Sequence, residues 1–176
     1  WLVGPSGRII EVAAMSRSLP HDLTNALAAA AIVLEARLAS TADVARALAT
    51  FQHPPHRTEP LGEIAGVRWF NDSKATSPHA ALTAIQGFER IVLLAGGRNK
   101  GLDLASLATD HDRIKAVVAL GDAAEEIVAA FSAHCPVEVA TDMADAVRRA
   151  AALATPGDVV LLSPACASFD WYPGGG

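Results

Sequence analysis

The sequence has few cysteines and few aromatic residues. Two of its 176 residues are cysteines, and 5% are aromatic. Cys135 and Cys166 do not have the spacing of a metal site, and reduced thiols are the simplest interpretation, although a disulfide between them is left open. Cys166 stands between alanines with no base nearby in the sequence, which favours a packing role over nucleophilic catalysis.

The chain also lacks an excess of positive charge and a long apolar run. Its net charge is −5, from 14 basic and 19 acidic residues, and no basic run is present, so a nucleic-acid surface is not expected. No apolar stretch reaches the ~20 residues of a membrane span. A signal peptide is not expected from the first residues given. Trp1 begins inside an apolar element and three glycines end the chain abruptly, so we expect a fragment of a longer protein.

Neither common glycine-rich nucleotide motif is present. Gly96, Gly97 and Gly101 do not have the G-x-G-x-x-G spacing, and Lys100 precedes the last glycine instead of following it. A dinucleotide site is therefore disfavoured. A lysine in a glycine-rich turn is better suited to a carboxylate or a phosphate, which it meets as a point charge.

What the sequence does contain is a strand–helix alternation that begins after Thr58. The composition, 51% hydrophobic and 19% charged, is that of an α/β protein. The expected strands are the apolar runs 67–70, 91–95, 116–120, 137–140 and 159–162, and the expected helices are 80–86, 104–107, 123–131 and 142–153. Continuous apolar strands that alternate with helices predict a Rossmann-like, mostly parallel sheet with helices on both faces.

A boundary is expected where Gln-His-Pro-Pro, residues 52–55, ends a helix, because proline cannot continue a helix and also restricts the residue before it. We therefore divide the chain into residues 1–54 and 55–176. The first part should contain a strand at 8–12 and two helices. The helix that begins near His21 is expected to bury Leu23, Leu27, Ala30 and Leu34, and the next helix begins with a capping box from Ser40 to Asp43.

Polar motifs follow three of the expected strands, at residues 71–76, 96–101 and 163–168. In parallel sheets ligands bind outside the carboxyl ends of the strands, so these motifs should meet at one edge. The first motif leads into a helix start at Ser77 and Pro78, where backbone N–H groups favour anions. Ser163 and Ser168 lie among small residues, where hydroxyls are suited to an anion.

Taken together, these residues resemble the Mur ligase family, from about residue 21 to residue 172. The resemblance rests on His-Asp-Leu-Thr-Asn at 21–25, Pro-His-Arg-Thr-Glu at 55–59, Asn-Asp-Ser-Lys-Ala-Thr at 71–76, the glycines and lysine of 96–101, and Ser-Pro-Ala-Cys-Ala-Ser at 163–168. The two hexapeptides, at 71–76 and 163–168, are far more specific than a glycine pattern, and they favour the D-glutamate-adding branch. The resemblance implies that residues 55–176 are the family's C-terminal domain and residues 1–54 the tail of its central ATPase domain.

The resemblance further implies a cytoplasmic, monomeric ligase of peptidoglycan synthesis that uses ATP and Mg²⁺. Such an enzyme joins D-glutamate to UDP-N-acetylmuramoyl-L-alanine through an acyl phosphate. The chain lacks the family's phosphate loop and the lysine that the family carbamylates, so ligation by this chain alone is not expected. The alternatives are a sibling such as folylpolyglutamate synthase or another Mur ligase, a nucleotide-binding Rossmann-type module, and a non-catalytic remnant.

Individual roles also follow from the resemblance. His56 and Lys74 would be catalytic, with His56 ordering the metal and phosphate region and Lys74 beside the transferred phosphoryl group. Asn25 would contact the adenine, Arg57 the nucleotide and Asp72 its ribose. Thr76, Lys100, Ser168 and the backbone at Phe169 would hold the D-glutamate carboxylates. No metal ligand is implied. Asp22 and Ser77 stand where the family commonly has asparagine.

Overall fold

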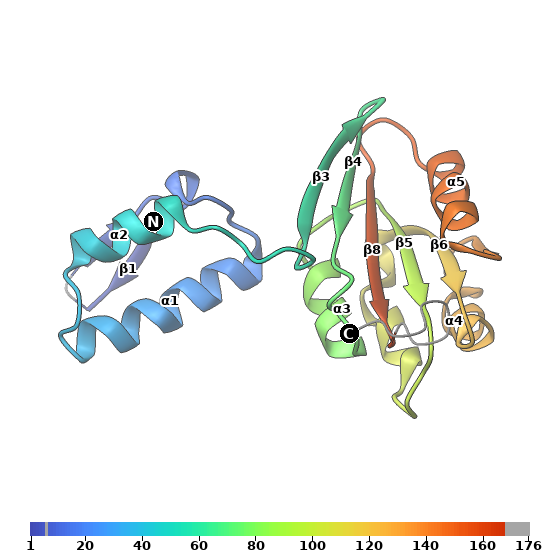
Figure 1. Cartoon of the computed structure of the whole chain (residues 1–176), viewed down its shortest axis with the longest axis horizontal. Coiled ribbons are helices and arrows are strands. Elements are labelled where there is room, and N and C mark those ends of the chain that lie inside the picture. The colour runs from blue at the N-terminus through green and yellow to red at the C-terminus, as the bar shows by residue number, and fades with distance from the viewer. Residues whose placement is uncertain (6, 168–176) are drawn as a thin grey trace. The chain divides into compact units, whose positions relative to one another are not determined.

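The computed structural model of the chain describes residues 1–5 and 7–167, and it divides into two compact units. Unit 1 comprises Trp1–His53 and unit 2 comprises Pro54–Gly176. Figure 1 shows the elements of each unit. Within the described part of the chain, no helix is both long and apolar enough to cross a membrane.

Unit 1 is a small antiparallel hairpin covered by helices. Its elements are β1 (Leu2–Gly4), β2 (Gly7–Ile10), the short 3₁₀ helix η1 (Val12–Ala14), α1 (Pro20–Glu35) and α2 (Thr41–Thr50). The predicted capping box of α2 is confirmed, because Ser40 accepts from the Asp43 N–H group and Asp43 accepts from that of Ser40. The predicted stripe on α1 is confirmed at Ala30 but is wrong at Leu27, which is 41% exposed, because the helix buries Ala26 instead.

Unit 2 is built on a six-stranded sheet with the order β3-β4-β8-β5-β6-β7. The strands are β3 (Glu59–Ile64), β4 (Val67–Asn71), β5 (Ile91–Gly96), β6 (Ile114–Leu120), β7 (Val137–Val139) and β8 (Val159–Ala165). All neighbouring strands are parallel except β3, which pairs antiparallel with β4. The predicted mostly parallel α/β sheet is confirmed, and β3 is an edge strand that the sequence pattern did not indicate.

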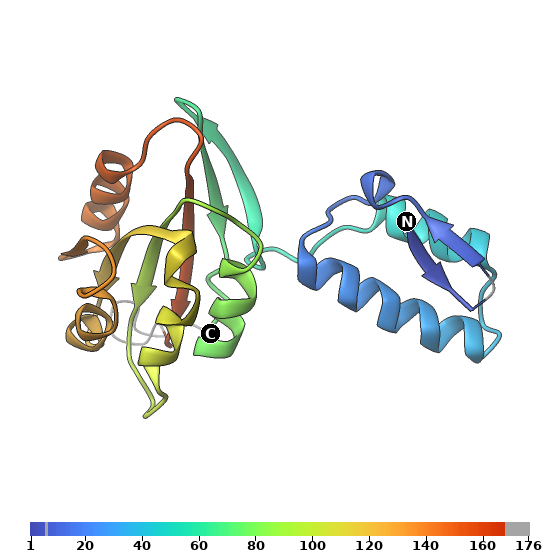
Figure 2. The ribbon, with the colours of Figure 1, turned by 180° about the vertical axis from the view of Figure 1, so that it is seen from behind.

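Helices cover both faces of this sheet, as predicted. They are α3 (Pro78–Ile85), the 3₁₀ segment η2 (Leu104–Arg113), α4 (Ala124–Phe131) and α5 (Met143–Leu153). On one face Ala146 and Ala150 of α5 join the core formed by alternate residues of β5 and β6, such as Val92 and Val118. Seen from behind, α3 and η2 lie over the opposite face (Figure 2).

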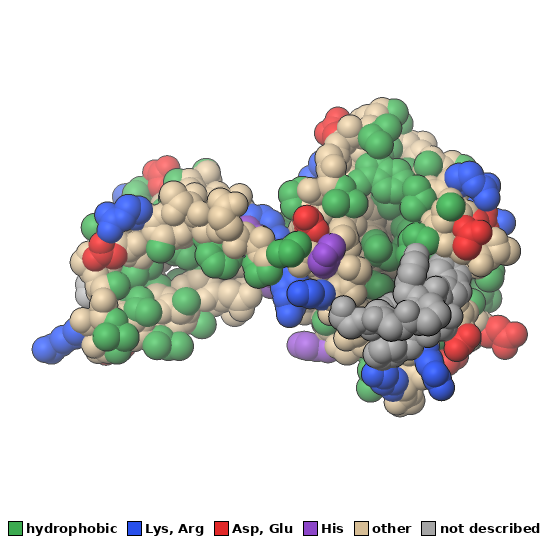
Figure 3. Space-filling model, viewed as in Figure 1, with side chains coloured by type: hydrophobic (Ala, Val, Ile, Leu, Met, Phe, Trp, Pro, Cys, Tyr) green, Lys and Arg blue, Asp and Glu red, His purple; other side chains and the backbone are tan. Residues whose placement is uncertain are grey.

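The face of the sheet under α5 is covered unevenly. Every residue of β5 is buried, whereas Trp69 of β4 and Leu162 of β8 are only partly buried against the core. Figure 3 shows apolar side chains on this face between the β3–β4 hairpin and α5. The indole N–H of Trp69 is buried and has no hydrogen-bond partner among the described residues.

At the amino edge of the sheet, Asp158 is a fully buried carboxylate that joins three segments. It accepts from Lys115 Nζ at 2.6 Å, from Arg90 Nε at 2.7 Å and from the Thr155 N–H group at 2.8 Å. Burial alone raises the pKa of Asp158, but these hydrogen bonds outweigh it and hold the pKa well below its usual range. The charged side chains at this edge therefore stabilise the fold.

Candidate functional site

The opposite, carboxyl edge brings together the segments that carry the polar motifs. Strand β8 lies between β4 and β5, and the arrows of β8, β5 and β6 point to the same edge (Figure 1). We refer to residues 71–76 as the β4 segment, 96–101 as the β5 segment and 163–167 as the β8 segment. The Ala165 N–H group donates to the Ala75 carbonyl at 2.8 Å, and the Arg98 N–H group donates to the Ala167 carbonyl at 2.8 Å. The β8 segment is thus bonded to both neighbours.

The two adjacent glycines of the β5 segment are required by close backbone contacts. A Cβ atom on Gly96 would lie 2.1 Å from the Leu120 carbonyl oxygen, and one on Gly97 would lie 2.5 Å from that of Ala167. Both glycines have positive φ angles, +128° and +122°. The glycine pair therefore joins the β5 segment to β6 and to the β8 segment.

Asp72 links three parts of the site from the inside. It is 6% exposed, and one carboxylate oxygen accepts from the Thr58 N–H group at 2.9 Å and from the Thr58 hydroxyl at 3.3 Å. The other oxygen accepts from the Ser163 hydroxyl at 2.8 Å. Ser163 is fully buried, so the anion that its hydroxyl faces is the internal Asp72 carboxylate and not a bound ligand. The ribose contact of Asp72 stays a prediction.

Backbone strain is concentrated around this edge. His56, Thr58 and Ala165 have left-handed φ angles of 63°, 48° and 61°. Such conformations cost a non-glycine residue about 1–3 kcal/mol and persist only where surrounding contacts enforce them. The N–H group of each of these residues is hydrogen-bonded: that of His56 to Glu59, that of Thr58 to Asp72, and that of Ala165 to Ala75. The residues that precede β3 are thereby held against the β4 segment.

Cationic and hydroxyl side chains remain on the outside of this edge. Arg57, Lys74, Thr76 and Lys100 are all exposed. Within residues 1–5 and 7–167, the Lys74 ammonium group makes no hydrogen bond or ion pair. The predicted cap of α3 is confirmed at Ser77, whose hydroxyl accepts from the Ala80 N–H group, and this helix start adds N–H groups beside Lys74. The edge is therefore suited to an anion.

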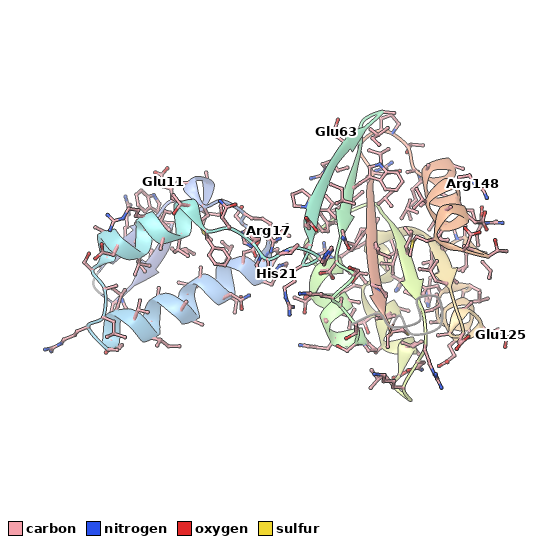
Figure 4. All side chains as sticks on the ribbon, in the orientation of Figure 1. Glu11, Arg17, His21, Glu63, Glu125 and Arg148 are labelled. Atoms are coloured by element: carbon pink, nitrogen blue, oxygen red, sulfur yellow. The ribbon has the colours of Figure 1, made fainter. Side chains whose placement is uncertain are left out.

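Asn25 belongs to unit 1, where it is exposed on α1. A buried ion pair lies at the start of the same helix, where Arg17 Nε and Nη2 each donate to the Asp22 carboxylate at 2.7 Å. Figure 4 shows Arg17 and His21 beside one another there. Burial raises the pKa of Asp22, but the hydrogen bond and charge of Arg17 outweigh it, so the pKa is lowered. Burial, followed by the Arg17 charge, lowers the pKa of His53.

The predicted site residues thus fall into three groups. Unit 2 carries His56, Arg57, Asp72, Lys74, Thr76 and Lys100 on segments of one sheet edge. Asn25 lies in the other unit, and Ser168 and Phe169 lie outside the described residues. Thr58, which donates to Asp72, and Asn71, which contacts His56, were not predicted to have a role. For Asn71 the available signal was a carboxamide at the end of an apolar strand.

A parallel sheet whose carboxyl edge presents cations and hydroxyls defines a Rossmann-like, ligand-binding α/β domain. Comparison with known proteins narrows this class. Residues 56–166 match the domain described as "Mur ligase, glutamate ligase domain". The chain belongs to the Mur ligase family.

Relatives with high identity carry one name, UDP-N-acetylmuramoylalanine–D-glutamate ligase. The protein of Frankia casuarinae is 45% identical over 94% of this chain, and that of Nitrosococcus oceani is 42% identical over 98%. The chain spans 36% and 39% of the length of these two relatives.

Solved structures share the fold at lower identity. The UDP-N-acetylmuramate–alanine ligase of Thermotoga maritima has a TM-score of 0.68 at 17% identity, over 86% of this chain and 36% of that one. The bifunctional folylpolyglutamate synthase/dihydrofolate synthase of Yersinia pestis has a TM-score of 0.64 at 21% identity, over 81% of this chain and 36% of that one. These likenesses establish the fold alone.

Proposed function

We propose that this chain is the C-terminal part of an ATP-dependent ligase that joins D-glutamate to UDP-N-acetylmuramoyl-L-alanine. The names of relatives at 42–48% identity support the choice of substrates. The observation that carries the proposal is the hydrogen-bonded convergence of the β4, β5 and β8 segments beside Lys74, whose ammonium group has no partner among the described residues. Such an edge can hold a nucleotide that donates a phosphoryl group and, next to it, an anionic amino acid.

In this proposal residues 1–54 are the tail of the central ATP-binding domain, and residues 55–176 are the C-terminal domain. The ligase acts as a cytoplasmic monomer in peptidoglycan synthesis. Because the chain spans only 36% of the length of the Frankia relative, the activity belongs to the longer protein and not to this chain alone.

The nucleotide and the phosphoryl group are assigned to the side of the edge near β4. ATP supplies the phosphoryl group that activates the muramoyl-alanine carboxylate. Lys74 offsets negative charge on that group, since its ammonium group has no ion pair with any described residue to lose on binding. His56 and Arg57 bind phosphate oxygens, Asp72 meets the ribose, and Asn25 contacts the adenine.

D-Glutamate is assigned to the middle of the edge. Thr76 of the β4 segment and Lys100 of the β5 segment hold its carboxylates, together with Ser168 and the backbone at Phe169. A dianionic amino acid needs at least one cation and several neutral donors, and the exposed Lys100 and Thr76 provide one of each.

The residues of this chain fit the nucleotide better than they fit a metal. The exposed ammonium group of Lys74 and the exposed guanidinium group of Arg57 suit phosphate. Among the described residues, no group of three or more His, Cys, Asp or Glu side chains is placed to hold a metal ion. In the proposal Mg²⁺ would accompany ATP and would supply charge shielding of its phosphate groups.

The test is phosphate release from ATP by the full-length protein that carries this chain. Release is expected only when UDP-N-acetylmuramoyl-L-alanine and D-glutamate are both present. Turnover with another amino acid or with a folate in place of these substrates would instead support a sibling ligase. Nucleotide binding without release under any of these conditions would support a Rossmann-type binding module.

A further inference from the structure

The end of β4 contains a short chain of hydrogen bonds that leads to the ring of His56. The Ser73 N–H group donates to Asn71 Oδ1 at 3.0 Å. A backbone N–H group is always a donor, so this contact identifies the oxygen of the Asn71 carboxamide. Its NH₂ group must then be the atom that lies 2.8 Å from His56 Nδ1.

This contact determines where the proton of the neutral imidazole resides. A carboxamide NH₂ group only donates, so His56 Nδ1 must accept and carries no proton. The single proton of the neutral ring is then on Nε2. Among the described residues Nε2 has no partner, and the side chain is 51% exposed.

The backbone of His56 is held to the same segment. Its N–H group donates to the Glu59 carboxylate at 2.9 Å, and its carbonyl accepts from the Lys74 N–H group at 3.2 Å. Glu59 is also the charged group nearest the ring, with Oε2 3.6 Å from Nδ1. That carboxylate alone would favour a proton on Nδ1. The hydrogen bond from Asn71 opposes this and selects the tautomer with the proton on Nε2.

We propose that Asn71 is a positioning residue that holds His56 as the Nε2–H tautomer, so that the imidazole meets the ligand as a hydrogen-bond donor. Metal binding by a neutral imidazole uses an unprotonated nitrogen. In His56 that nitrogen is occupied by Asn71, and the other carries the proton. The tautomer follows from this chain alone. That the Nε2–H group meets an oxygen of the transferred phosphate rests on the proposed function.

The experiment is a long-range ¹H–¹⁵N spectrum of the histidine rings of the 176-residue chain, recorded at about pH 8, above the ordinary histidine pKa. The His56 signals are assigned by their loss in His56→Gln. The wild-type ring should show a proton on Nε2 only. In Asn71→Asp a carboxylate faces Nδ1 while its other oxygen still accepts from Ser73, so a proton should appear on Nδ1. The tautomer ratio should change by at least about tenfold, as expected for exchanging one hydrogen bond for a repulsion.

Two further variants make the result decisive. Asn71→Ala removes both contacts and should leave His56 as a mixture of tautomers. Asn99→Asp is the matched control, because its amide contacts Leu102 and Glu126 instead of a histidine, and it should leave the His56 signals unchanged. Identical His56 signals in the wild type and Asn71→Asp, with both chains folded by circular dichroism, would overturn the proposal.

The same variant in the full-length protein separates this inference from the proposed function. Asn71→Asp should lower kcat and leave the KM for D-glutamate unchanged. If the tautomer changes but the full-length wild type has no ligase activity, the proposed function fails and the positioning role stands. If ligation occurs but the tautomer does not change, the positioning role fails.

Discussion

At the scale of single residues, the carboxyl edge combines buried side chains that join segments of the fold with side chains that are exposed. Asp72 and Ser163 are buried and bonded to each other, whereas Lys74 and Lys100 are exposed. The acid of the Asn-Asp-Ser-Lys motif therefore points into the protein and the lysine two residues later lies outside. Substitution of the exposed lysines should therefore change the kinetics, whereas substitution of the buried pair should change the stability.

Lys100→Ala should raise the KM for D-glutamate in the full-length protein by about tenfold or more, the usual cost of a lost charge-assisted hydrogen bond. The KM for ATP should change little. Lys74→Ala is the reciprocal variant, with the loss expected mainly in kcat, by about 10²-fold or more. Steady-state kinetics with each substrate varied in turn measures both. An unchanged D-glutamate KM in Lys100→Ala would show that this lysine does not hold the substrate.

Asp72→Ala should lower the free energy of unfolding of unit 2 by about 2–3 kcal/mol, because it removes the buried acceptor that Thr58 and Ser163 share. Urea unfolding measures the change. Asp72→Asn keeps the shape and an acceptor oxygen, so it should cost less. Ser163→Ala removes one donor and should cost about 1 kcal/mol. A wild-type stability for Asp72→Ala would show that the carboxylate does not link these segments.

At the scale of elements, neighbouring segments are joined by backbone contacts that leave no room for side chains. The β5 segment approaches the β8 segment so closely that Gly97 has the Ala167 carbonyl where a Cβ atom would be. Contact of this kind transmits the position of one segment to the next. We therefore expect a single added methyl group at Gly97 to push the β5 and β8 segments apart.

Gly97→Ala should therefore destabilise unit 2 more than its φ angle alone requires. Gly62→Ala is a matched control, because Gly62 has nearly the same φ angle, +125° against +122°, but nothing lies within 4 Å of its added Cβ atom. The clash should cost Gly97→Ala a further 1–3 kcal/mol, approximately the range for overpacking, where ~2 kcal/mol is typical. Urea unfolding of both variants gives the difference. Equal losses would mean that the β5 and β8 segments separate without cost.

Much of this architecture was predictable from local patterns. The apolar runs from Val67 to Leu162 and the cap at Ser77 depend on neighbouring residues, and the structure confirms them. Strand β3 was missed because Pro60, Gly62 and two glutamates obscure its pattern, and its pairing with β4 comes from the hairpin. The order that puts β8 between β4 and β5 depends on long-range packing, which no local pattern encodes.

The interior of the site was harder to predict for a related reason. Ser163 continues the alternation of Val159 and Leu161, both fully buried, so its inward direction was readable from the strand period. Its partner, Asp72, lies on another strand. The hydrogen bond between Asn71 and His56 likewise joins residues 15 apart. Such contacts depend on the folded arrangement.

At the scale of the whole chain, each unit has its own core. The core of unit 1 contains Leu2, Ile9, Ile10 and Val44 together with the small Ala26 and Ala30. Unit 2 buries entire strands and larger side chains, such as Phe131 and Ile127. Because stability increases with the apolar area removed from water, unit 2 should be the more stable of the two. We therefore expect two unfolding transitions.

Asp158→Asn should show that the later of these transitions is the unfolding of unit 2, because the pH dependence of that transition should change. The pKa of Asp158 is lowered in the folded chain, so between the unfolded and folded pKa values the unfolded chain binds more protons. Its contribution to stability is therefore present in full above about pH 4, the ordinary aspartate pKa, and is lost as the pH falls further. Urea unfolding at about pH 7 and about pH 3 should show an acid destabilisation of the later transition in the wild type, to which Asp158 contributes about 1 kcal/mol, and a smaller one in Asp158→Asn.

Val44→Ala supplies the converse control, because Val44 lies in the core of unit 1, and it should move only the earlier transition. At neutral pH Asp158→Asn should also destabilise unit 2, since it leaves Lys115 and Arg90 without their buried partner. If Asp158→Asn and Val44→Ala shifted the same transition by similar amounts, the two units would unfold as one, and their separate cores would not be separate folding units.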